Sequence, residues 1–286
     1  MQSYQRVVDL RESLAPTRAS GKRIAFVPTM GNLHEGHMQL IRLAHQHADV
    51  VVASIFVNPL QFGLNEDWEM YPRMLASDTT QLMQEKCDYL FCPTEQEIYP
   101  NGMETQTKVI VPTMTDILCG ASRPGHFTGV TTIVAKLFNM VLPHVAILGI
   151  KDYQQLTVIR RMVEDLCFPI DIVAAPTARA PDGLALSSRN AYLNKTEREQ
   201  STALHKTLLW VQCQLKDGRR DYVQLETQGQ QKLLDAGMRP DYLSVRQAQT
   251  LELATAADTE IVVLAAVYLG RTRLIDNLTI QLNHMV

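Results

Sequence analysis

The chain has 286 residues, of which 46% are hydrophobic and 20% are charged, and its formal net charge at pH 7 is -3. This balance is typical of a globular protein with one large domain or two modest ones. It argues against a protein that binds nucleic acids or acidic membranes in general, because no broad basic field would attract polyanions.

Cysteine usage and hydropathy bear on the compartment. Five cysteines without a C-x-x-C pair indicate reduced thiols rather than a disulfide framework. The N-terminal residues lack a basic stretch followed by an apolar one, and no apolar run reaches the roughly 18 residues of a membrane span. We therefore expect a cytoplasmic protein without a membrane segment.

Apolar runs alternate with helical patterns from residue 23 to residue 173. Strands are predicted at residues 23–27, 49–57, 89–92, 108–111, 145–149 and 168–173, and helices at 38–44, 75–86, 131–141 and from 152. Such alternation predicts a parallel sheet with right-handed crossovers, in the Rossmann-like, doubly wound α/β class.

The pattern changes after Pro176. Two predicted helices, at 196–215 and 224–236, come first, and predicted strands near 242–245, 261–267 and 273–276 follow. This order predicts a smaller α+β domain with antiparallel strands. We place the boundary near residue 175, which gives a nucleotide- and substrate-binding domain at 1–175 and a smaller lid domain at 176–286.

The segment Pro28–His37 lies between a predicted strand and a predicted helix. Gly31 and Gly36 allow a sharp turn, and the helix would begin with free N–H groups and a partial positive charge that favour a phosphate. His34 and His37 are three residues apart, so they should share one face of the first helical turn. Each could donate a proton or a hydrogen bond to a phosphate oxygen.

The same spacing also fits two surface histidines on an ordinary helix, but the preceding strand and the glycines favour the phosphate interpretation. Zinc is less attractive, because the spacing is not H-E-x-x-H and no Cys or third His stands nearby. Residues Leu33–His37 are similar to the H-x-G-H motif of the nucleotidylyltransferase superfamily. Members of that superfamily attack the α-phosphate of a nucleoside triphosphate.

Two amides, Asn58 and Gln61, follow the second apolar run. Such residues commonly cap loop backbones, and beside the histidine motif they could equally bind the hydroxyl and carboxylate groups of a small substrate. The loop 58–72 is long and polar, as functional loops often are. Arg73, just beyond it, either pairs with a carboxylate or holds the loop closed.

A second strand–glycine–helix segment spans Gly149–Leu156. Lys151 at the end of a buried strand needs an anionic partner, which a phosphate would supply. Asp152 either caps the helix or binds a ribose hydroxyl, and Gln155 lies about one helical turn further on the same face. Because ligands bind at the carboxyl ends of strands in such sheets, the segments that follow these strands are expected to converge.

Two turn-rich segments complete the candidates. The loop 179–190 lies between the predicted domains and includes Ser187, Ser188 and Arg189. These side chains are either solvated surface or a mobile clamp for phosphate oxygens. Residues 123–127 contain an arginine and a histidine and form either a rigid helix entry or part of the catalytic machinery.

With these motifs in order, the chain resembles the pantoate–β-alanine ligase family over nearly its whole length, from Pro28–Gly31 to Leu274–Asn277. The resemblance implies that ATP and pantoate give pantoyl adenylate and pyrophosphate, and that β-alanine then converts the adenylate to pantothenate and AMP. It also implies a homodimer, and Mg²⁺ bound mainly by ATP oxygens rather than by a protein cage.

The resemblance assigns site residues as well. His37, His34, Lys151 and Arg189 would be catalytic, and Gln61, Gln155, Asn58 and Tyr71 would hold pantoate and β-alanine. The residues implied for ATP binding are Met30, Gly31, Asn32, Leu33, His34, Glu35, Gly36, His37, Gly149, Ile150, Lys151, Asp152, Ala178, Leu186, Ser187, Ser188 and Arg189. No metal ligand among the protein side chains is implied.

Three positions depart from the family pattern. Ile150 stands where Glu is common, His144 where Asp is common and Leu64 where Pro is common. None of the three removes a group that the implied mechanism requires. Ile150 leaves only its backbone for a role at that position.

Two other functions fit parts of the sequence. A nucleotidylyltransferase that keeps the nucleotide on its product would use the same histidine motif, whereas the amides at 58, 61 and 155 favour a small hydroxy acid. A nucleotide-binding regulatory or RNA-binding module would need a basic aromatic surface, which the composition does not indicate. The sequence therefore favours an ATP-dependent acid–amine ligase that acts on pantoate and β-alanine.

Overall fold

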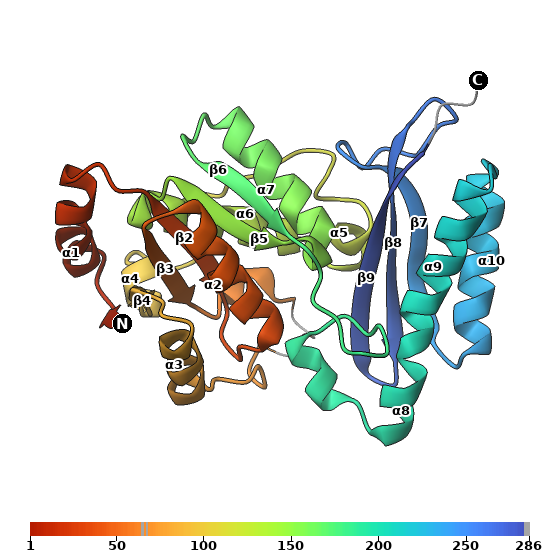
Figure 1. Ribbon diagram of the computed structural model, residues 1–286, viewed down its shortest axis with the longest axis horizontal. Helices are drawn as coiled ribbons and strands as arrows, with labels where there is room; N and C mark the ends of the chain where they lie inside the picture. The colour runs from red at the N-terminus through yellow and green to blue at the C-terminus, as the bar shows by residue number, and fades with distance from the viewer. Residues whose placement is uncertain (64–65, 67, 283–286) are drawn as a thin grey trace. The chain divides into compact units, whose positions relative to one another are not determined.

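The computed structural model describes residues 1–63, 66 and 68–282. The chain divides into two compact units (Figure 1). Unit 1 comprises Met1–Ile150 and Val158–Pro176, and unit 2 comprises Lys151–Thr157 and Thr177–Val286. All five cysteines are free thiols. Within the described part of the chain, no helix is both long enough and apolar enough to cross a membrane.

Unit 1 contains a six-stranded parallel sheet in the order β1-β4-β3-β2-β5-β6. Its strands are β1 (Gln2–Tyr4), β2 (Ile24–Thr29), β3 (Val50–Ile55), β4 (Tyr89–Phe91), β5 (Val145–Gly149) and β6 (Asp171–Ala175). The central strands β2, β3 and β5 are almost entirely apolar, as expected where helices cover both faces of a sheet. The predicted doubly wound α/β class is confirmed.

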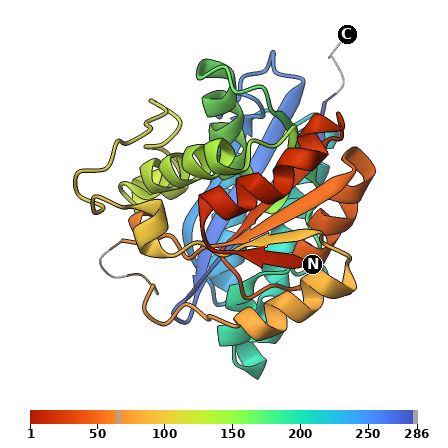
Figure 2. The same ribbon diagram turned by 90° about the vertical axis from the view of Figure 1, so that its left-hand side faces the viewer.

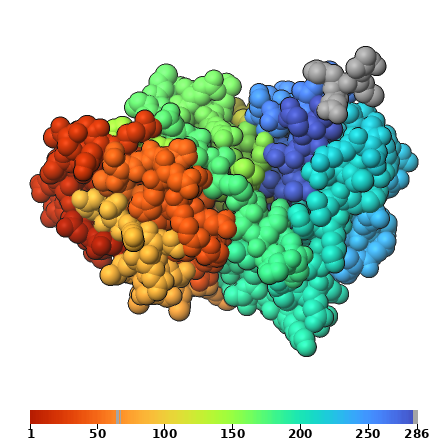
Figure 3. All heavy atoms as spheres, in the orientation of Figure 1, coloured from red at the N-terminus to blue at the C-terminus, as the bar shows by residue number. Residues whose placement is uncertain are grey.

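The helices of this part of the chain lie on both sides of the sheet (Figure 2). They are α1 (Val7–Ala19), α2 (Glu35–His47), α3 (Leu75–Gln84), α4 (Glu95–Ile98), α5 (Cys119–Ser122), α6 (His126–Val141) and α7 (Tyr153–Asp165), with short 3₁₀ turns η1 (Pro59–Gln61) and η2 (Ile150–Asp152). Helices α1 and α6 pack against each other, as do α2 and α3. Helix α3 lies at the surface of unit 1 (Figure 3), with Leu82 buried and Met83 exposed.

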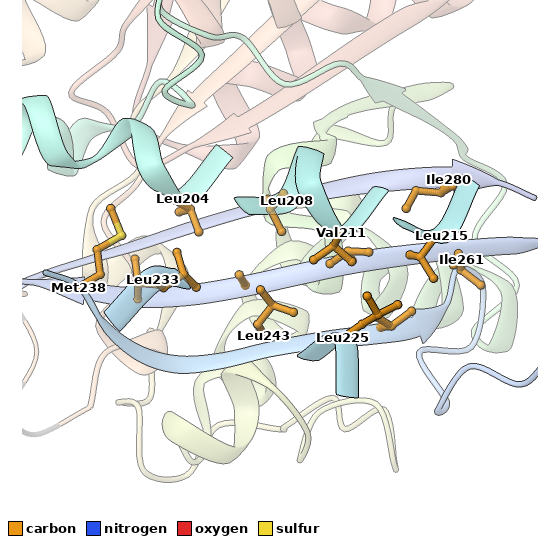
Figure 4. Close-up of a cluster of buried hydrophobic side chains, with 14 of the residues drawn as sticks. Leu204, Leu208, Val211, Leu215, Leu225, Leu233, Met238, Leu243, Ile261 and Ile280 are labelled. Carbon is orange, nitrogen blue, oxygen red and sulfur yellow. The ribbon is translucent and has the colours of Figure 1, made fainter. Parts of the chain in front are cut away.

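Unit 2 contains a three-stranded antiparallel sheet in the order β7-β8-β9. Its elements are η3 (Ser188–Tyr192), α8 (Lys195–Gln200), α9 (Thr202–Lys216), α10 (Tyr222–Asp235), β7 (Arg239–Gln247), β8 (Glu260–Leu269) and β9 (Thr272–Gln281). Apolar side chains of α9 and α10, such as Leu208 and Leu225, pack against Leu243 and Ile280 of the sheet (Figure 4). The predicted smaller α+β portion is confirmed.

One predicted strand is wrong. Residues 108–111 form no strand, and side-chain hydroxyls of α6 bond the backbone groups of Val109 instead. The N–H of Val109 donates to Thr132 Oγ1 at 3.0 Å, and Thr131 Oγ1 donates to the Val109 carbonyl at 2.6 Å. Hydroxyls can therefore replace a neighbouring strand as partners of an extended backbone.

Several element boundaries also differ from the sequence pattern. Strand β2 continues through Pro28 to Thr29, and α6 begins at His126 rather than at residue 131. The helix predicted at 196–215 is two helices that meet at Ser201, a fully buried residue whose hydroxyl donates to the Arg198 carbonyl at 2.7 Å. Strand β1 and helix α1 were not predicted. Helix α1 carries an internal proline, Pro16, and only two of its side chains are buried.

Candidate active site

A buried carboxylate holds the turn between β2 and α2. Asp78, only 1% exposed, accepts hydrogen bonds from the N–H groups of Asn32 and Leu33, both at 2.8 Å. Gly31 has φ +81°, and a Cβ there would lie 3.0 Å from the Asp78 carboxylate. Glycine therefore permits both the left-handed backbone and the close approach of α3.

Asp78 was not identified from the sequence, although a signal was available. Asp78 precedes Leu82 by one helical turn, so the predicted helix at 75–86 places a carboxylate on its apolar face. A buried charge at such a position needs hydrogen-bond donors from elsewhere in the fold. Here the donors are the backbone N–H groups of the histidine turn.

His34 is the N-cap of α2, with extended backbone angles, so the prediction that it lies in the first helical turn is wrong. Its Nδ1 accepts a hydrogen bond from the N–H of Gly36 at 3.1 Å. The His37 Nδ1 accepts one from the N–H of His34 at 3.2 Å. The two rings still lie side by side, with centroids 4.2 Å apart and planes at 48°.

This capping arrangement changes how the turn can bind an anion. The N–H groups of Asn32 and Leu33 are bonded to Asp78, and the Gly36 N–H is bonded to His34. They are therefore not the free donors that the sequence analysis expected. Because both Nδ1 atoms accept, each ring in its neutral form carries its proton on Nε2.

The amides of the β3–η1 segment form a connected network. Asn58, 1% exposed, donates through Nδ2 to Gln61 Oε1 at 3.2 Å and to the Gly129 carbonyl at 3.1 Å. Its Oδ1 accepts from the Tyr99 hydroxyl at 2.6 Å. Gln61 in turn donates through Nε2 to Met30 Sδ at 3.0 Å. Asn58 thus orients Gln61, and Tyr99 orients Asn58.

Burial raises the pKa of the Tyr99 phenol, with a smaller contribution from Glu95. The hydroxyl therefore remains protonated and can donate to Asn58 throughout the neutral pH range. Neither Tyr99 nor Gly129 was identified from the sequence. A Cβ at Gly129 would lie 2.3 Å from the Leu60 carbonyl oxygen, so only glycine allows α6 to approach η1 this closely.

The segment 123–127 holds the backbone of Gln61. The Gln61 carbonyl contacts His126 Nδ1 at 2.7 Å and accepts from Arg123 Nη2 at 3.4 Å. Arg123 also pairs with Glu66 at 2.5 Å. Burial opposes ionisation of Glu66, but the hydrogen bond and charge of Arg123, together with His126 and the backbone of Gly63, outweigh it, and the pKa of the carboxyl falls below its usual value. These residues therefore tie the start of α6 to Gln61 and Glu66.

Arg73 holds the same loop from its far end. It donates to the carbonyls of Trp68, Glu69 and Tyr71 at 3.2 to 3.3 Å and lies 5.5 Å from the Trp68 ring centroid. The interpretation of Arg73 as a loop-closing residue is therefore favoured over a pair with a carboxylate. Tyr71 is 5% exposed, and its ring packs edge-on against Phe62 at 5.8 Å. The departure at Leu64 lies outside the described residues.

Two other residues named from the sequence have local roles. The carboxylate of Glu35 is exposed and forms an ion pair with Arg42 at 2.5 Å, and the hydrogen bond from Arg42 lowers its pKa. His144 accepts the Ile24 N–H through Nδ1 at 2.9 Å. A carboxylate could accept the same bond, which explains why the family's common Asp can be replaced by His at this position.

In unit 2, Lys151 follows β5 and lies in η2, as the strand–glycine–helix pattern predicted. Its side chain is 20% exposed, and its ammonium lies 3.8 Å from the Asp152 carboxylate. The Lys151 carbonyl accepts from Asn277 Nδ2 at 2.9 Å. Gln155 is partly buried in the first turn of α7.

The loop 177–187 is a hydrogen-bonded hairpin. The Leu186 N–H donates to the Ala178 carbonyl at 2.9 Å, and Arg179 forms a bridge with Ala185. The guanidinium of Arg179 donates to both oxygens of Asp276, at 2.6 and 2.9 Å. Ser187 then caps η3, which contains Ser188 and Arg189. The Asp276 anchor was not identified from the sequence.

A parallel sheet with paired imidazoles after its second strand defines a Rossmann-like α/β enzyme. A family model described as pantoate-beta-alanine ligase matches residues 2–279. The chain therefore belongs to the pantoate–β-alanine ligase family.

Individual relatives agree with this assignment. Pantothenate synthetase of Saccharophagus degradans is 54% identical over 281 residues, which are 98% of this chain and 99% of the relative. Pantothenate synthetase of Cellvibrio japonicus is 56% identical over 282 residues, 99% of this chain and 100% of the relative. Curated relatives thus match the chain from end to end.

Solved structures are similar as well. Pantothenate synthetase of Thermus thermophilus has a TM-score of 0.91 and 42% identity, with 97% of this chain and 99% of that chain covered. Pantoate–β-alanine ligase of Francisella tularensis, in complex with β-γ ATP and β-alanine, has a TM-score of 0.81 and 35% identity, with 97% of both chains covered. The chain is thus an enzyme of the pantoate–β-alanine ligase type.

Proposed function

We propose that the chain condenses pantoate with β-alanine to give pantothenate, using ATP and forming AMP and pyrophosphate. The observation that supports this proposal most directly is the histidine turn after β2, where His34 and His37 lie 4.2 Å apart in a member of this family. The Francisella relative, 35% identical, is described with ATP and β-alanine bound. Those two ligands agree with the substrates proposed here.

In the first step, a carboxylate oxygen of pantoate attacks the α-phosphorus of ATP, and pyrophosphate leaves. Because the nucleophile and the triphosphate are both anionic, cations and hydrogen-bond donors around the phosphates should supply most of the rate enhancement. We assign the Nε2–H groups of His34 and His37 to phosphate oxygens. The NH₂ group of Gln61 is assigned to the pantoate carboxylate, with Asn58 as its positioning residue.

Unit 2 carries the remaining proposed ligands. We assign Lys151, Ser187, Ser188 and Arg189 to the α-phosphate and the departing pyrophosphate, where their charges and hydroxyls oppose the accumulating negative charge. Gln155 is assigned to pantoate. The backbone groups of residues 149–152, Ala178 and Leu186 are assigned to the nucleotide.

In the second step, the amine of β-alanine attacks the acyl carbonyl of pantoyl adenylate, AMP leaves and the amine loses a proton. The adenylate must be protected from water until the amine arrives. The described residues of the loop 58–72, held by Arg73, Arg123 and the packing of Tyr71 on Phe62, are suited to this task. Tyr71 is assigned to the substrate side of this loop.

We propose Mg²⁺ as the counter-ion of the triphosphate. Among residues 1–63, 66 and 68–282, no group of three or more His, Cys, Asp or Glu side chains could hold a metal ion. In nucleotide sites, Mg²⁺ is commonly coordinated mainly by phosphate oxygens and water, and we propose the same coordination here. The ion would neutralise phosphate charge.

We further propose that the protein acts as a cytoplasmic homodimer. Both statements follow from the family resemblance. Sedimentation or light scattering of the purified protein tests the dimer: a mass of twice the 32.2 kDa chain is expected. A monomer at micromolar concentration would contradict it.

The activity is tested with the three substrates and purified enzyme. We expect AMP and pantothenate only when pantoate, β-alanine and ATP are all present. Without β-alanine, we expect at most one equivalent of pyrophosphate per site, because the adenylate remains bound. A stable, released product that still carries the nucleotide would instead support the alternative, a nucleotidylyltransferase that uses the same histidine motif.

A further inference from the structure

We propose that Asp276 and Asn277, adjacent residues of β9, are positioning residues that set the Lys151 turn and the Ser187–Arg189 segment relative to each other. The inference rests on the proposed function, in which both segments bind ATP phosphates. Neither β9 residue is assigned to a substrate. They act through Lys151 and through Arg179.

Asn277 acts on the Lys151 turn. Its side chain is 3% exposed, and its Nδ2 donates to the Lys151 carbonyl at 2.9 Å. Fixing this carbonyl restrains the peptide that follows Lys151 and therefore the direction in which the lysine side chain leaves η2. The bond joins residues 126 positions apart, so the local sequence of the turn cannot provide the same restraint.

Asp276 acts on the hairpin before Ser187. Both of its oxygens accept from Arg179, and the Arg179 Nη1 also donates to the Gly183 carbonyl at 3.0 Å. His205 Nδ1 lies 3.5 Å from the same carboxylate. A planar guanidinium bonded at two carboxylate oxygens and one carbonyl fixes the hairpin in direction as well as in distance. Ser187 is the last residue of this hairpin and the N-cap of η3.

Strand geometry explains why adjacent residues can serve different segments. Side chains alternate between the two faces of a strand, and the residues that share a face with Asp276 (Leu274, Leu278 and Ile280) pack in the core beneath α9 and α10. Asn277 points to the opposite face, toward the Lys151 carbonyl. The two are also linked directly, since the Asn277 N–H donates to Asp276 Oδ1 at 2.8 Å.

The position of Asp276 supports a role beyond packing. A carboxylate among buried leucines and isoleucines is costly unless it is fully paired. Burial opposes ionisation of Asp276, yet its interactions with His205 and Arg179, together with the N–H of Asn277, hold the pKa of the carboxyl below its usual value. The carboxylate therefore stays charged and bonded at neutral pH. An apolar residue at this position would fill the core but would leave the hairpin without its anchor.

The test compares Asn277→Ala with Thr279→Ala, a matched control at an exposed position on the same face of β9. We expect Asn277→Ala to lower kcat/KM for ATP about tenfold, the value of one hydrogen bond, while the pantoate KM changes less than about twofold. Thr279→Ala should match the wild type. Thermal unfolding is measured for each variant.

A double-mutant cycle separates positioning from a general structural effect. If Asn277 acts through Lys151, adding Asn277→Ala to the Lys151→Ala variant should lower kcat/KM for ATP by less than a further factor of about two. A full tenfold additional loss there, or an unchanged kcat/KM in the single variant, would overturn the inference for Asn277. Asp276→Asn and Arg179→Ala should likewise be non-additive, and additive losses would overturn the assignment to the hairpin.

These results are distinguishable from failure of the proposed function. If wild-type enzyme forms no pantothenate from the three substrates, the proposed function fails whatever the variants do. If the wild type is active and Asn277→Ala retains wild-type kinetics, only the present inference fails. Asn277→Asp provides a second variant of nearly the same shape that cannot donate to a carbonyl, and we expect it to behave like Asn277→Ala.

Discussion

The side-chain amide of Asn58 donates to the side-chain carbonyl of Gln61 at 3.2 Å, and this bond determines which end of Gln61 a ligand meets. The oxygen and nitrogen of the Asn58 side-chain amide cannot exchange places, because the NH₂ group also donates to the Gly129 carbonyl and the oxygen accepts from the Tyr99 hydroxyl. Gln61 must therefore present its NH₂ group. A carboxylate oxygen is the complementary acceptor.

Gln61→Glu should consequently impair pantoate binding more than ATP binding. The new carboxylate can still accept from Asn58, but it places a negative oxygen where the NH₂ group stood. We expect the pantoate KM to rise about tenfold or more and the ATP KM to change less than about threefold. Steady-state kinetics provide the measurement, with the exposed Gln84→Glu as control. A larger change in the ATP KM would show that Gln61 is misassigned.

His34 has two separable roles, and two substitutions distinguish them. His34→Asn removes the imidazole but keeps a good N-cap, so stability should stay within about 0.5 kcal/mol while kcat falls about 100-fold or more. His34→Ala loses the cap as well and should unfold about 1 kcal/mol more easily. Urea unfolding and kcat are compared for both. Near-normal turnover of His34→Asn would refute the assignment of this ring to the phosphates.

Asp78→Asn tests how the histidine turn is held. An amide has only one acceptor oxygen, so one of the N–H groups of Asn32 and Leu33 would lose its partner inside the protein. We expect a loss of about 1–3 kcal/mol in the free energy of unfolding, measured in urea, and a higher ATP KM. The control is Asp235→Asn at an exposed position of α10 in unit 2, where the amide oxygen of the new side chain can still accept from Gln231. Equal effects of Asp78→Asn and Asp235→Asn would contradict the proposed role.

The histidine turn and the amides show how far the sequence could predict the site. The H-x-G-H motif and the Gly149 segment were correctly placed after strands, here β2 and β5, because turns after apolar strands are local features. The donors in the histidine turn were predicted less well. Their assignment depends on Asp78, a residue 45 or more positions away that supplies no local signal in the turn.

The same limit applies to the fold. Strands such as β3 and β5 were predicted because continuous apolar runs need two covering layers. Residues 108–111 have an equally strand-like composition, but hydroxyls of α6 satisfy the backbone instead. Which groups become the hydrogen-bond partners of this backbone depends on the tertiary structure, not on the local sequence. The relation between Lys151 and the two histidines likewise stays a prediction.

His144 predicts a pH effect on stability. Burial, together with Arg18 and Arg23, lowers the pKa of the ring, and its Nδ1 must be unprotonated to accept the Ile24 N–H. A pKa lowered on folding gives stability that is present above the unfolded value of about 6.5 and is lost as the pH falls through the folded value.

His144→Asp should remove this dependence, because a carboxylate still accepts at pH 5.5. We expect the Tm of the wild type to fall by on the order of 1–3 °C more than that of His144→Asp between pH 7.5 and 5.5. The two proteins differ only at residue 144, so the difference between their pH profiles reports on His144. Parallel pH profiles would contradict the assignment.

Lys151→Ala tests the proposed cation at the α-phosphate. The side chain is 20% exposed and its ammonium lies 3.8 Å from the Asp152 carboxylate. Such an ion pair contributes little to the free energy of folding. We expect kcat to fall about 100-fold or more, because a charge that stabilises the transition state is lost, while the Tm changes by less than about 2 °C. Lys206→Ala, an exposed lysine of α9 in the same unit, should retain full activity. Turnover of Lys151→Ala within threefold of the wild type would exclude Lys151 from the chemical step, since an enzyme that relies on this ammonium cannot tolerate its removal.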